Sequence, residues 1–512
     1  MTTHLAKDKP KVLVVGAGPT GLLLSLVLMR QGVQVRLIDQ KSGPIKESRA
    51  MGVQARTLEF YRQLGLSEAL VKLGVQTENT HLGVNGRKVA QFSLKNMGQG
   101  LSPYPYLLTL AQDVHESFLV EQLAACGLYV EWSTTLKTLA QDGTTVKTIV
   151  ILPDGSEEEI ETSYLVGCDG ARSTTRQALG IAFGGGTSEG LFYVADVDIG
   201  RNNQDVHVGI APDTLALMMP VRTSGMQRIL GIVPKTIATQ ANISFNDVSQ
   251  DSAHLLNIKV KAVNWFSTYR VHHRVAERFR EERCFIAGDA GHIHSPVGGQ
   301  GMNTGLGDAM NLAWKLAQVI NNRADAKLLN TYEPERIKFA RQLINTTDGM
   351  FQKMTAEGWF TRYLRVSIVP SIIKLLTRYP ITKRSLFKTV SQIRIAYTDS
   401  PLSQGKQGRI SAGERLPFVP EIDNHQSLNC LDWQLHIYGE PSKSLTELVA
   451  KLGLTITLFP YSPAVRKAGF ARNQAYLIRP DGYIALIMTN QNSTQLADYV
   501  QTWGLKFSPQ NG

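Results

Sequence analysis

Three glycines near the start of the chain, Gly16, Gly18 and Gly21, have the G-x-G-x-x-G spacing of a phosphate-binding turn. In such a motif the first glycine permits a tight turn, the second lets a pyrophosphate approach the backbone, and the third lets a helix pack against a strand. Asp39 follows 18 residues after Gly21 and can accept hydrogen bonds from both hydroxyls of an adenosine ribose. The spacing therefore predicts a dinucleotide site, and the acid at position 39 disfavours a 2′-phosphate there.

The segments around these glycines have the pattern that such a site needs. Residues 11–15 form a short apolar run rich in β-branched side chains, as expected of a buried parallel strand. Residues 22–29 are typical of a buried helix that ends near Gly32, and residues 33–38 are typical of the next strand. The N-terminus of that helix offers N–H groups and the positive end of its dipole to phosphates. A glycine turn without a ligand is the weaker alternative, because the strand, the helix, the second strand and the acid are all present.

Two further glycine motifs each follow an apolar run that is predicted to be a strand. The run at residues 164–168 leads into residues 169–176, D-G-A-R-S-T-T-R. The run at residues 283–287 leads into residues 288–290, G-D-A, and then into residues 296–301, P-V-G-G-Q-G. In α/β proteins, ligands bind where such strands end. The order and spacing of the three motifs are typical of a flavin enzyme.

The three motifs together resemble those of the FAD-dependent aromatic-ring hydroxylases, the group A flavoprotein monooxygenases typified by p-hydroxybenzoate hydroxylase. Within that family the chain is most similar to the branch that contains phenol hydroxylase, 3-(3-hydroxyphenyl)propionate hydroxylase and the polyketide hydroxylases. The resemblance extends over nearly the full chain and implies an α/β fold. The implied parts are a Rossmann-like FAD-binding domain, an inserted antiparallel-sheet substrate domain, connecting helices and a C-terminal thioredoxin-like domain.

The resemblance and the apolar segments together give the expected domain boundaries. The FAD-binding domain is expected in two parts, residues 1–182 and 283–330, with the substrate domain at residues 183–282 between them. Connecting helices are expected at residues 331–404 and the C-terminal domain at residues 405–512. The C-terminal domain has no C-x-x-C pair, so dithiol chemistry is excluded and a role in packing or dimerisation is expected.

The resemblance also implies roles for individual residues. Asp289 is expected to bind the ribityl and pyrophosphate side of FAD, and the loop from Pro296 to Gly301 to lie against the isoalloxazine ring. In this interpretation, the N-terminus of the helix at residues 302–319 points at the N1–C2=O edge of the isoalloxazine ring. The helix dipole favours negative charge at that edge. Asp169 and Arg176 are linked to the cofactor and to NAD(P)H. The full set expected to bind the cofactor is Gly16, Gly18, Pro19, Thr20, Gly21, Asp39, Gln40, Arg49, Gln54, Gln112, Asp169, Arg176, Gly288, Asp289, Pro296, Gly299, Gly301, Met302 and Asn303.

The activity implied by the resemblance is hydroxylation of a phenolic or polyketide-type aromatic substrate through a C4a-hydroperoxyflavin. NADPH or NADH is the electron donor and O₂ the oxidant, while the protein positions the reactants and excludes water. Two alternatives stay open: a non-catalytic or regulatory flavoprotein, and another flavin oxygenation such as epoxidation. A halogenase is disfavoured, because no tryptophan of the chain lies in a W-x-W-x-I-P sequence.

No residue stands out as the catalytic group. Tyr104, Tyr106 and Tyr193 are weak candidates, since they lie in regions expected to border the pocket beside the Pro296 loop, although a tyrosine is more often simply packed. Arg56 and Arg172 fit surface charges as well as they fit cofactor contacts.

The composition is that of a globular protein with several domains. Of its 512 residues, 43% are hydrophobic and 19% are charged. No window approaches the roughly 18 apolar residues that span a bilayer, and no signal sequence is recognised, so a cytoplasmic protein is expected. The four cysteines have no metal-binding spacing, and the histidine pairs at 272–273 and 292–294 lack a third ligand, so no metal site is expected. The expected partners are a small aromatic substrate and O₂, without nucleic acid.

Much of the net charge of +11 lies in one segment. Residues 358–398 contain eight Lys or Arg residues and no Asp or Glu, with apolar residues between them. A basic amphipathic helix can lie on an anionic membrane. Connecting helices that pack on the protein, with solvated charges, are favoured here because the relatives have connecting helices in this region. Weak peripheral membrane contact through this segment and formation of a homodimer both stay open.

Overall fold

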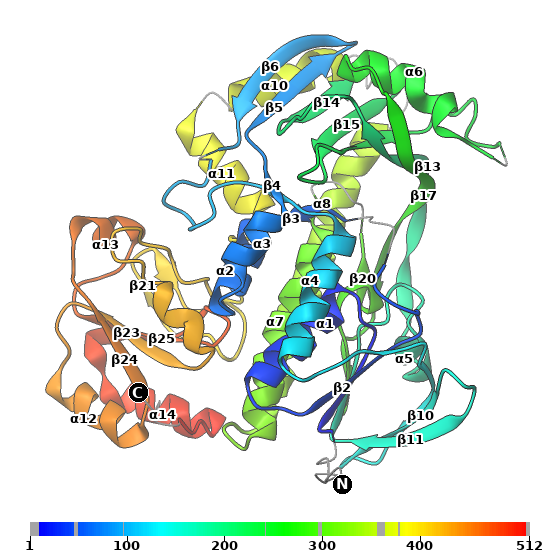
Figure 1. Ribbon diagram of the computed structural model, residues 1–512. Coiled ribbons are helices and arrows are strands. Elements are labelled where there is room, and N and C mark those ends of the chain that lie inside the picture. Colours follow the sequence, from blue (N-terminus) through cyan, green and yellow to red (C-terminus); the bar gives the residue numbers. More distant parts are fainter. Residues whose placement is uncertain are drawn as a thin grey trace.

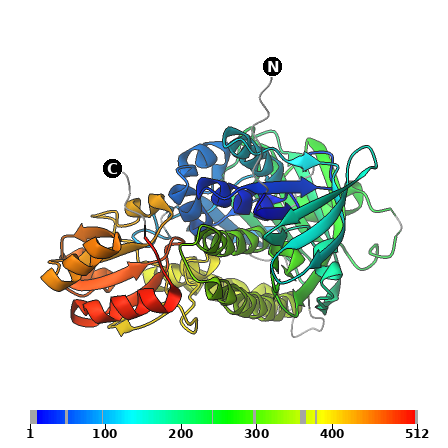
Figure 2. The same ribbon diagram turned by 90° about the horizontal axis from the view of Figure 1, so that it is seen from below.

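The computed structural model describes residues 10–45, 50–95, 97–240, 242–294, 299–355, 364–376 and 379–507. It confirms the expected α/β fold, with a mainly parallel sheet, a long antiparallel sheet and a C-terminal sheet (Figure 1). Seen from below, the C-terminal elements form a lobe at one side of the molecule (Figure 2).

One sheet of six strands carries the three glycine motifs. Its order is β18-β19-β12-β1-β2-β8. These strands are β1 (Val12–Val15), β2 (Val35–Asp39), β8 (Glu131–Trp132), β12 (Tyr164–Gly167), β18 (Arg280–Glu281) and β19 (Cys284–Ile286). β1 pairs in parallel with β2 and β12, and β12 pairs in parallel with β19. The carboxyl ends of β1, β12 and β19 therefore bring the three motifs to one edge of the sheet.

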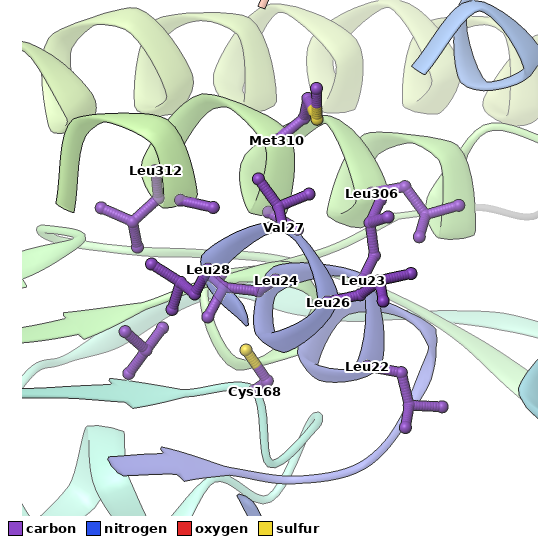
Figure 3. Close-up of a cluster of buried hydrophobic side chains, with 14 of the residues drawn as sticks. Leu22, Leu23, Leu24, Leu26, Val27, Leu28, Cys168, Leu306, Met310 and Leu312 are labelled. Carbon is purple, nitrogen blue, oxygen red and sulfur yellow. The ribbon is translucent and has the colours of Figure 1, made fainter. Parts of the chain in front are cut away.

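Helix α1 (Pro19–Arg30) follows the first motif directly. Its proline lies in the first turn, where the missing N–H removes no helical hydrogen bond. Residues 21–28 are all buried, because α1 lies between the sheet and α7 (Gly301–Ile320). Figure 3 shows the leucines of α1 packed against apolar side chains of α7. After the helix, Gly32 adopts a φ of +77°, which agrees with the stop expected there.

A second sheet of eight strands stands over this edge, in the order β20-β17-β13-β16-β15-β14-β5-β6. Its strands are β5 (Asn79–Val84), β6 (Arg87–Ser93), β13 (Phe183–Asp198), β14 (Val206–Ile210), β15 (Leu215–Pro220), β16 (Gln227–Ile232), β17 (Ala262–Ala276) and β20 (His292–Ile293). The inserted sheet was expected from residues 183–282, but β5, β6 and β20 come from outside that range. β5 pairs in parallel with β14 and so covers a strand edge that would otherwise be unpaired.

The two faces of this sheet have different neighbours. Helix α6 (Phe245–Leu256) packs on one face, where Tyr193, Ala195 and Val197 of β13 belong to a buried core. Residues of opposite parity, such as Phe192, point to the other face because side chains alternate along a strand. That second face looks towards the glycine motifs.

The C-terminal part of the chain forms a four-stranded sheet in the order β24-β23-β25-β26. It contains β23 (Gln434–Tyr438), β24 (Thr455–Phe459), β25 (Gln474–Ile478) and β26 (Ile484–Met488), with α12 (Lys443–Leu452), α13 (Pro463–Ala468) and α14 (Ser493–Trp503). β23, β25 and β26 are buried along their whole length. The thioredoxin-like assignment and the domain boundaries stay predictions.

Buried charges join this C-terminal part to the rest of the molecule. Arg479 donates to both carboxylate oxygens of Glu335, at 2.9 and 3.0 Å, and to both oxygens of Asp481, at 2.9 and 2.7 Å. Lys315 of α7 donates to Glu335 at 2.8 Å. Burial lowers the pKa of Lys315 to about 8, against the opposing effect of Glu335. Such a network holds only while every charge keeps its partner, since an unpaired buried charge is costly.

The remaining elements connect these parts. They are β3 (Gly52–Val53), α2 (Ala55–Gln63), α3 (Ser67–Leu73), β4 (Val75–Gln76), β7 (Leu108–Thr109), α4 (Gln112–Ala125), β9 (Thr135–Gln141), β10 (Val146–Ile151), β11 (Glu157–Thr162), α5 (Thr174–Ala178), α8 (Tyr332–Thr355), a π-helix (Leu364–Ile368), α10 (Val369–Leu376), α11 (Pro380–Val390), β21 (Lys406–Gln407) and β22 (Ile410–Ser411), with short 3₁₀ turns. Among the residues described, no helix combines the length and apolar character that crossing a bilayer requires.

Candidate active site

A cavity of about 1910 Å³ lies between the edge of the six-stranded sheet and the eight-stranded sheet. The first wall consists of the glycine motifs and their neighbours, including Gly16, Gly18, Pro19, Thr20, Asp39, Gln40, Gln54, Gln112, Asp169, Asp289, Gly299, Gly301 and Met302. The second wall is mostly apolar and includes Leu82, Phe92, Phe192, Val208, Leu217, Met219, Leu230, Ile232, Tyr269, Ile368 and Ile372. One continuous space therefore joins a nucleotide-type wall to an apolar wall.

The first glycine turn has the geometry that its sequence predicts. Gly16 adopts a φ of +105°, and a Cβ atom there would lie 2.4 Å from the backbone oxygen of Cys168. A Cβ atom on Gly21 would lie 1.9 Å from the backbone oxygen of Gly16. A Cβ atom on Gly18 would meet no atom within 4 Å, since this glycine faces open space. The turn thus leaves room at Gly18 for a phosphate group, which fits a bound dinucleotide.

Asp39 stands at the end of β2 and is tied to this turn. One carboxylate oxygen accepts from the Ala17 N–H at 2.6 Å, and the other accepts from the Lys41 N–H at 2.8 Å. Each oxygen has a second lone pair, so two backbone bonds leave acceptor capacity for a ligand. Because Asp39 also lines the cavity, its predicted contact with the ribose hydroxyls agrees with its position.

The second motif is held together by Asp169. Its carboxylate accepts from the Ser173 hydroxyl at 2.5 Å and from the Thr175 N–H at 2.9 Å. Arg176 is buried behind the turn, where it donates to the backbone oxygens of Ala290 and Ala171, both at 2.9 Å. The side chain of Asp169 reaches the cavity, whereas that of Arg176 is not in the cavity wall. Arg176 therefore connects the second motif to the third, and its link to the cofactor and to NAD(P)H stays a prediction.

The third motif is supported by a buried acid that the sequence reasoning missed. Asp308 of α7 accepts from the Gly288 N–H at 3.0 Å, from His292 Nε2 at 2.6 Å and from Arg336 Nε at 2.6 Å. Burial opposes ionisation, but Arg336 and His292 overcome it and lower the pKa of Asp308 to about 2. Asp308 is the one acid in the sequence of α7, and that was the available signal. His292 is itself buried, at 2% exposed, and Asp308 fixes the position of its ring.

Asp289 is exposed to the cavity rather than packed. Partial loss of water raises the pKa of its carboxyl, while His292 acts in the opposite direction. A carboxylate in this place can accept hydrogen bonds from the hydroxyls of a ligand. Its predicted role at the ribityl chain agrees with this position.

The N-terminus of α7 is tied to β3 by Asn303. Its Oδ1 accepts from the Gln54 N–H at 2.9 Å, and its Nδ2 donates to the backbone oxygens of Gly52 and Gly299, both at 2.8 Å. Asn303 is thus buried and shapes the cavity from behind, while Gly299, Gly301 and Met302 form part of the wall. Arg49 and Pro296 lie outside the described residues.

The three tyrosines proposed as catalytic candidates do not line the cavity. Tyr193 packs on the α6 side of the sheet, and Tyr104 and Tyr106 pack against the core of the FAD-binding part. This corrects the expectation that they border the pocket, and alternation along β13 is the reason for Tyr193. Tyr269 of β17 is the tyrosine found in the described part of the cavity wall, with its ring 5.9 Å from that of Phe192. Burial raises its pKa to about 12, so its hydroxyl stays protonated.

The two ambiguous arginines have different positions. Arg56 is 2% exposed and donates to Glu59 at 3.0 Å and to the backbone oxygen of Asp481 at 2.6 Å. Surface charge is therefore the wrong interpretation for Arg56. Arg172 is exposed and lines the cavity.

Comparison with known proteins agrees with this geometry. The family described as FAD binding domain matches residues 9–347. The 6-methylpretetramide 4-monooxygenase of Streptomyces rimosus is 32% identical to this chain, over 96% of the chain and 93% of its own length. The pentachlorophenol 4-monooxygenase of Sphingobium chlorophenolicum is 31% identical over 68% of the chain and 65% of its own length.

Solved structures lead to the same family. OxyS, an anhydrotetracycline hydroxylase from Streptomyces rimosus, superposes with a TM-score of 0.76 at 26% identity, over 97% of this chain and 99% of its own. CabE, an aromatic hydroxylase from angucycline biosynthesis, has a TM-score of 0.77 at 28% identity, over 98% of this chain and 100% of its own. The chain therefore belongs to the FAD-binding-domain family and is one of its flavin-dependent monooxygenases.

Proposed function

We propose that this enzyme hydroxylates a multi-ring aromatic substrate of polyketide type, with NADPH or NADH as electron donor and O₂ as oxidant. The observation that carries the proposal is the continuity of the cavity, which joins the glycine motifs to a broad apolar wall. Two relatives named for work on polycyclic compounds, the 6-methylpretetramide 4-monooxygenase and the anhydrotetracycline hydroxylase, align over nearly the whole chain.

Bound FAD supplies the redox chemistry that activates oxygen. The turn at Gly18 would hold the pyrophosphate, Asp39 the adenosine ribose, and Asp289 the ribityl chain. The first turn of α7 lines the cavity, and the positive end of its dipole there would stabilise negative charge on the bound ring system. Asn303 fixes that turn against β3 through its four hydrogen bonds, to Gln54, Thr57, Gly52 and Gly299.

The apolar wall supplies orientation and excludes water. Leu217, Leu230 and Ile232 offer no hydrogen bonds, so they hold a flat aromatic substrate by area alone. Tyr269 gives that wall a hydroxyl that stays protonated, and it donates a hydrogen bond to an oxygen of the substrate. Exclusion of water favours transfer of oxygen to the substrate over release of H₂O₂.

The test is oxidation of NADPH and of NADH in air by the FAD-loaded protein, with phenol, 1-naphthol or anhydrotetracycline present in turn. We expect a multi-ring compound to accelerate oxidation more than phenol does, with hydroxylated product formed and little H₂O₂. Oxidation that proceeds equally without any compound, and that yields H₂O₂ in the amount of nucleotide consumed, would contradict the proposal.

A further inference from the structure

Exposed apolar side chains gather on one short stretch of the chain. Of the eleven large apolar residues that are exposed in the described part of the molecule, six lie within nineteen residues. They are Ile368, Ile372, Leu375, Tyr379, Ile381 and Leu386, with exposed fractions from 38% to 82%. We call these six residues, which run from the last residue of the π-helix through α10 into α11, the apolar face of α10 and α11. Several exposed apolar side chains this close together in the chain indicate an interaction surface.

The apolar face lies at the apolar end of the cavity. Helix α10 contacts β6 of the eight-stranded sheet, as Figure 1 shows. Ile368 and Ile372 line the cavity as well as being exposed, whereas Leu375, Tyr379 and Ile381 are exposed without lining it. A compound resting on the outer part of this face is therefore next to the apolar wall.

Helix α11 is already anchored by its other side. Phe387 is 7% exposed and packs in a small core with Ala55, Met97 and Ile393. Ile381, at the second position of the same helix, is 82% exposed. Helix α11 is thus packed on the protein through the side that carries Phe387, while the side that carries Ile381 is exposed to solvent.

The charge of the segment that carries this face indicates which kind of partner can bind there. In its described parts, residues 364–376 and 379–398, this segment contains six Lys or Arg residues and no acid. Lys383, Lys388 and Arg394 are among the described members of this set. Two copies of the chain joined through this face would bring two cationic surfaces together, which is unfavourable. An anionic partner with an apolar layer beneath its charges fits both properties.

We propose that the apolar face of α10 and α11 docks on the surface of an anionic lipid bilayer and that the apolar substrate enters the cavity from there. The apolar side chains enter the boundary between headgroups and acyl chains, and the basic side chains lie at the lipid phosphates. The proposal concerns peripheral contact, and it goes beyond the proposed function because binding to lipid can be measured without a substrate.

The test is co-sedimentation of the full-length, FAD-loaded protein with vesicles of phosphatidylcholine alone or with three parts in ten of phosphatidylglycerol. We expect binding to the vesicles with phosphatidylglycerol, weaker binding at high salt and little binding to phosphatidylcholine. Ile381→Asp should weaken binding about tenfold, and Lys383→Glu combined with Lys388→Glu should weaken it by at least as much, since each basic residue near an anionic surface contributes roughly fivefold.

The matched control is Tyr129→Asp, because Tyr129 is 72% exposed and lies far from this face in the sequence, after α4. An acid in the first turn of a helix is favoured by the helix dipole, so Ile381→Asp should keep the fold, and FAD content and melting temperature check this. Absence of binding by the wild-type protein, or equal loss in the Tyr129 variant, would overturn the proposal. A wild-type dimer in solution that Ile381→Asp converts to a monomer would overturn it too, in favour of a second copy.

Failure of this proposal and failure of the proposed function give different results. A protein that binds vesicles but shows no substrate-dependent oxidation of NADPH or NADH would keep the lipid surface and lose the hydroxylase. The reverse result would keep the hydroxylase and remove the lipid surface.

Discussion

The two walls of the cavity differ in what they are made of. The wall at the six-stranded sheet depends on backbone: Gly16 and Gly21 leave no space for a side chain, and Asp39 and Asp169 accept backbone N–H groups. The wall at the eight-stranded sheet depends on side chains that alternate between a packed core and the cavity. One added atom should therefore disrupt the first wall, whereas the second should respond to size and polarity.

The largest effect is expected at the first wall. Gly21→Ala places a Cβ atom 1.9 Å from the backbone of Gly16, so the turn must rearrange, at a cost of about 3 kcal/mol or more of unfolding free energy. Gly18→Val places its Cβ atom in open space, so this variant should keep the stability of the apoprotein and lose FAD. Thermal melting with and without FAD measures both. Equal melting of the two apoproteins would show that the turn does not need a glycine at position 21.

The next effect concerns the buried acid behind that wall. Asp308→Asn leaves Arg336 buried without its anionic partner, which should cost about 3–5 kcal/mol. The pKa of Asp308 is lowered from the ordinary value near 3.8 to about 2 in the folded protein. A lowered pKa stabilises the fold above the unfolded value, so about 2 kcal/mol of stability should disappear as the pH falls from about 4 to 2. Urea unfolding at several pH values tests this, and Asp308→Asn should remove that part of the pH dependence.

Polar substitutions on neighbouring residues distinguish the two faces of the eight-stranded sheet. Leu217→Gln changes a residue in the cavity wall and should keep FAD content and fold while weakening substrate binding about tenfold. Met218→Gln changes the next residue, which is fully buried in the α6 core, and should cost about 2–4 kcal/mol of stability. For both variants, perturbation of the flavin absorbance by substrate measures substrate binding, and thermal melting measures stability. The same behaviour in both variants would mean that the alternation along β15 does not separate the faces.

The smallest effect is expected for a pair of hydroxyl groups. Tyr269→Phe removes a donor from the cavity wall and should raise KM about fivefold and increase the share of H₂O₂, as expected for loss of one hydrogen bond. Tyr193→Phe removes a hydroxyl from the α6 core, so stability should fall by about 1 kcal/mol with KM unchanged. Steady-state kinetics with product and H₂O₂ assays measure KM and the share of H₂O₂ for both variants. An unchanged KM in Tyr269→Phe would remove this residue from the substrate site.

The difference between the walls also explains what could be predicted from the sequence. Gly16, Gly18, Gly21 and Asp39 could be predicted from their spacing and the strand and helix patterns around them, because a backbone turn needs particular residue types at fixed intervals. The second wall has no such constraint: any large apolar residue on the correct face of a strand can serve. Tyr193 was chosen and Tyr269 was missed for this reason, since parity along β13 and β17 becomes informative only when the pairing of the strands is known.

Contacts between segments far apart in the sequence could not be predicted from the sequence either. Asp308 and Arg336 are 28 residues apart and meet at Gly288 through tertiary packing. The pairing of β5 with β14 joins residues more than a hundred positions apart, and nothing in the short segment at 79–84 specifies its partner.

The buried network around Glu335 limits how the C-terminal lobe can be exchanged in evolution or in engineering. Glu335 and Lys315 belong to the helices beside the flavin site, and Arg479 and Asp481 belong to the lobe. A chimera that brings in a lobe without the arginine and its acid would leave Glu335 with one cation in place of two. The lobe is thus not a freely interchangeable module, and recombination between relatives should succeed only where these charged positions are inherited together.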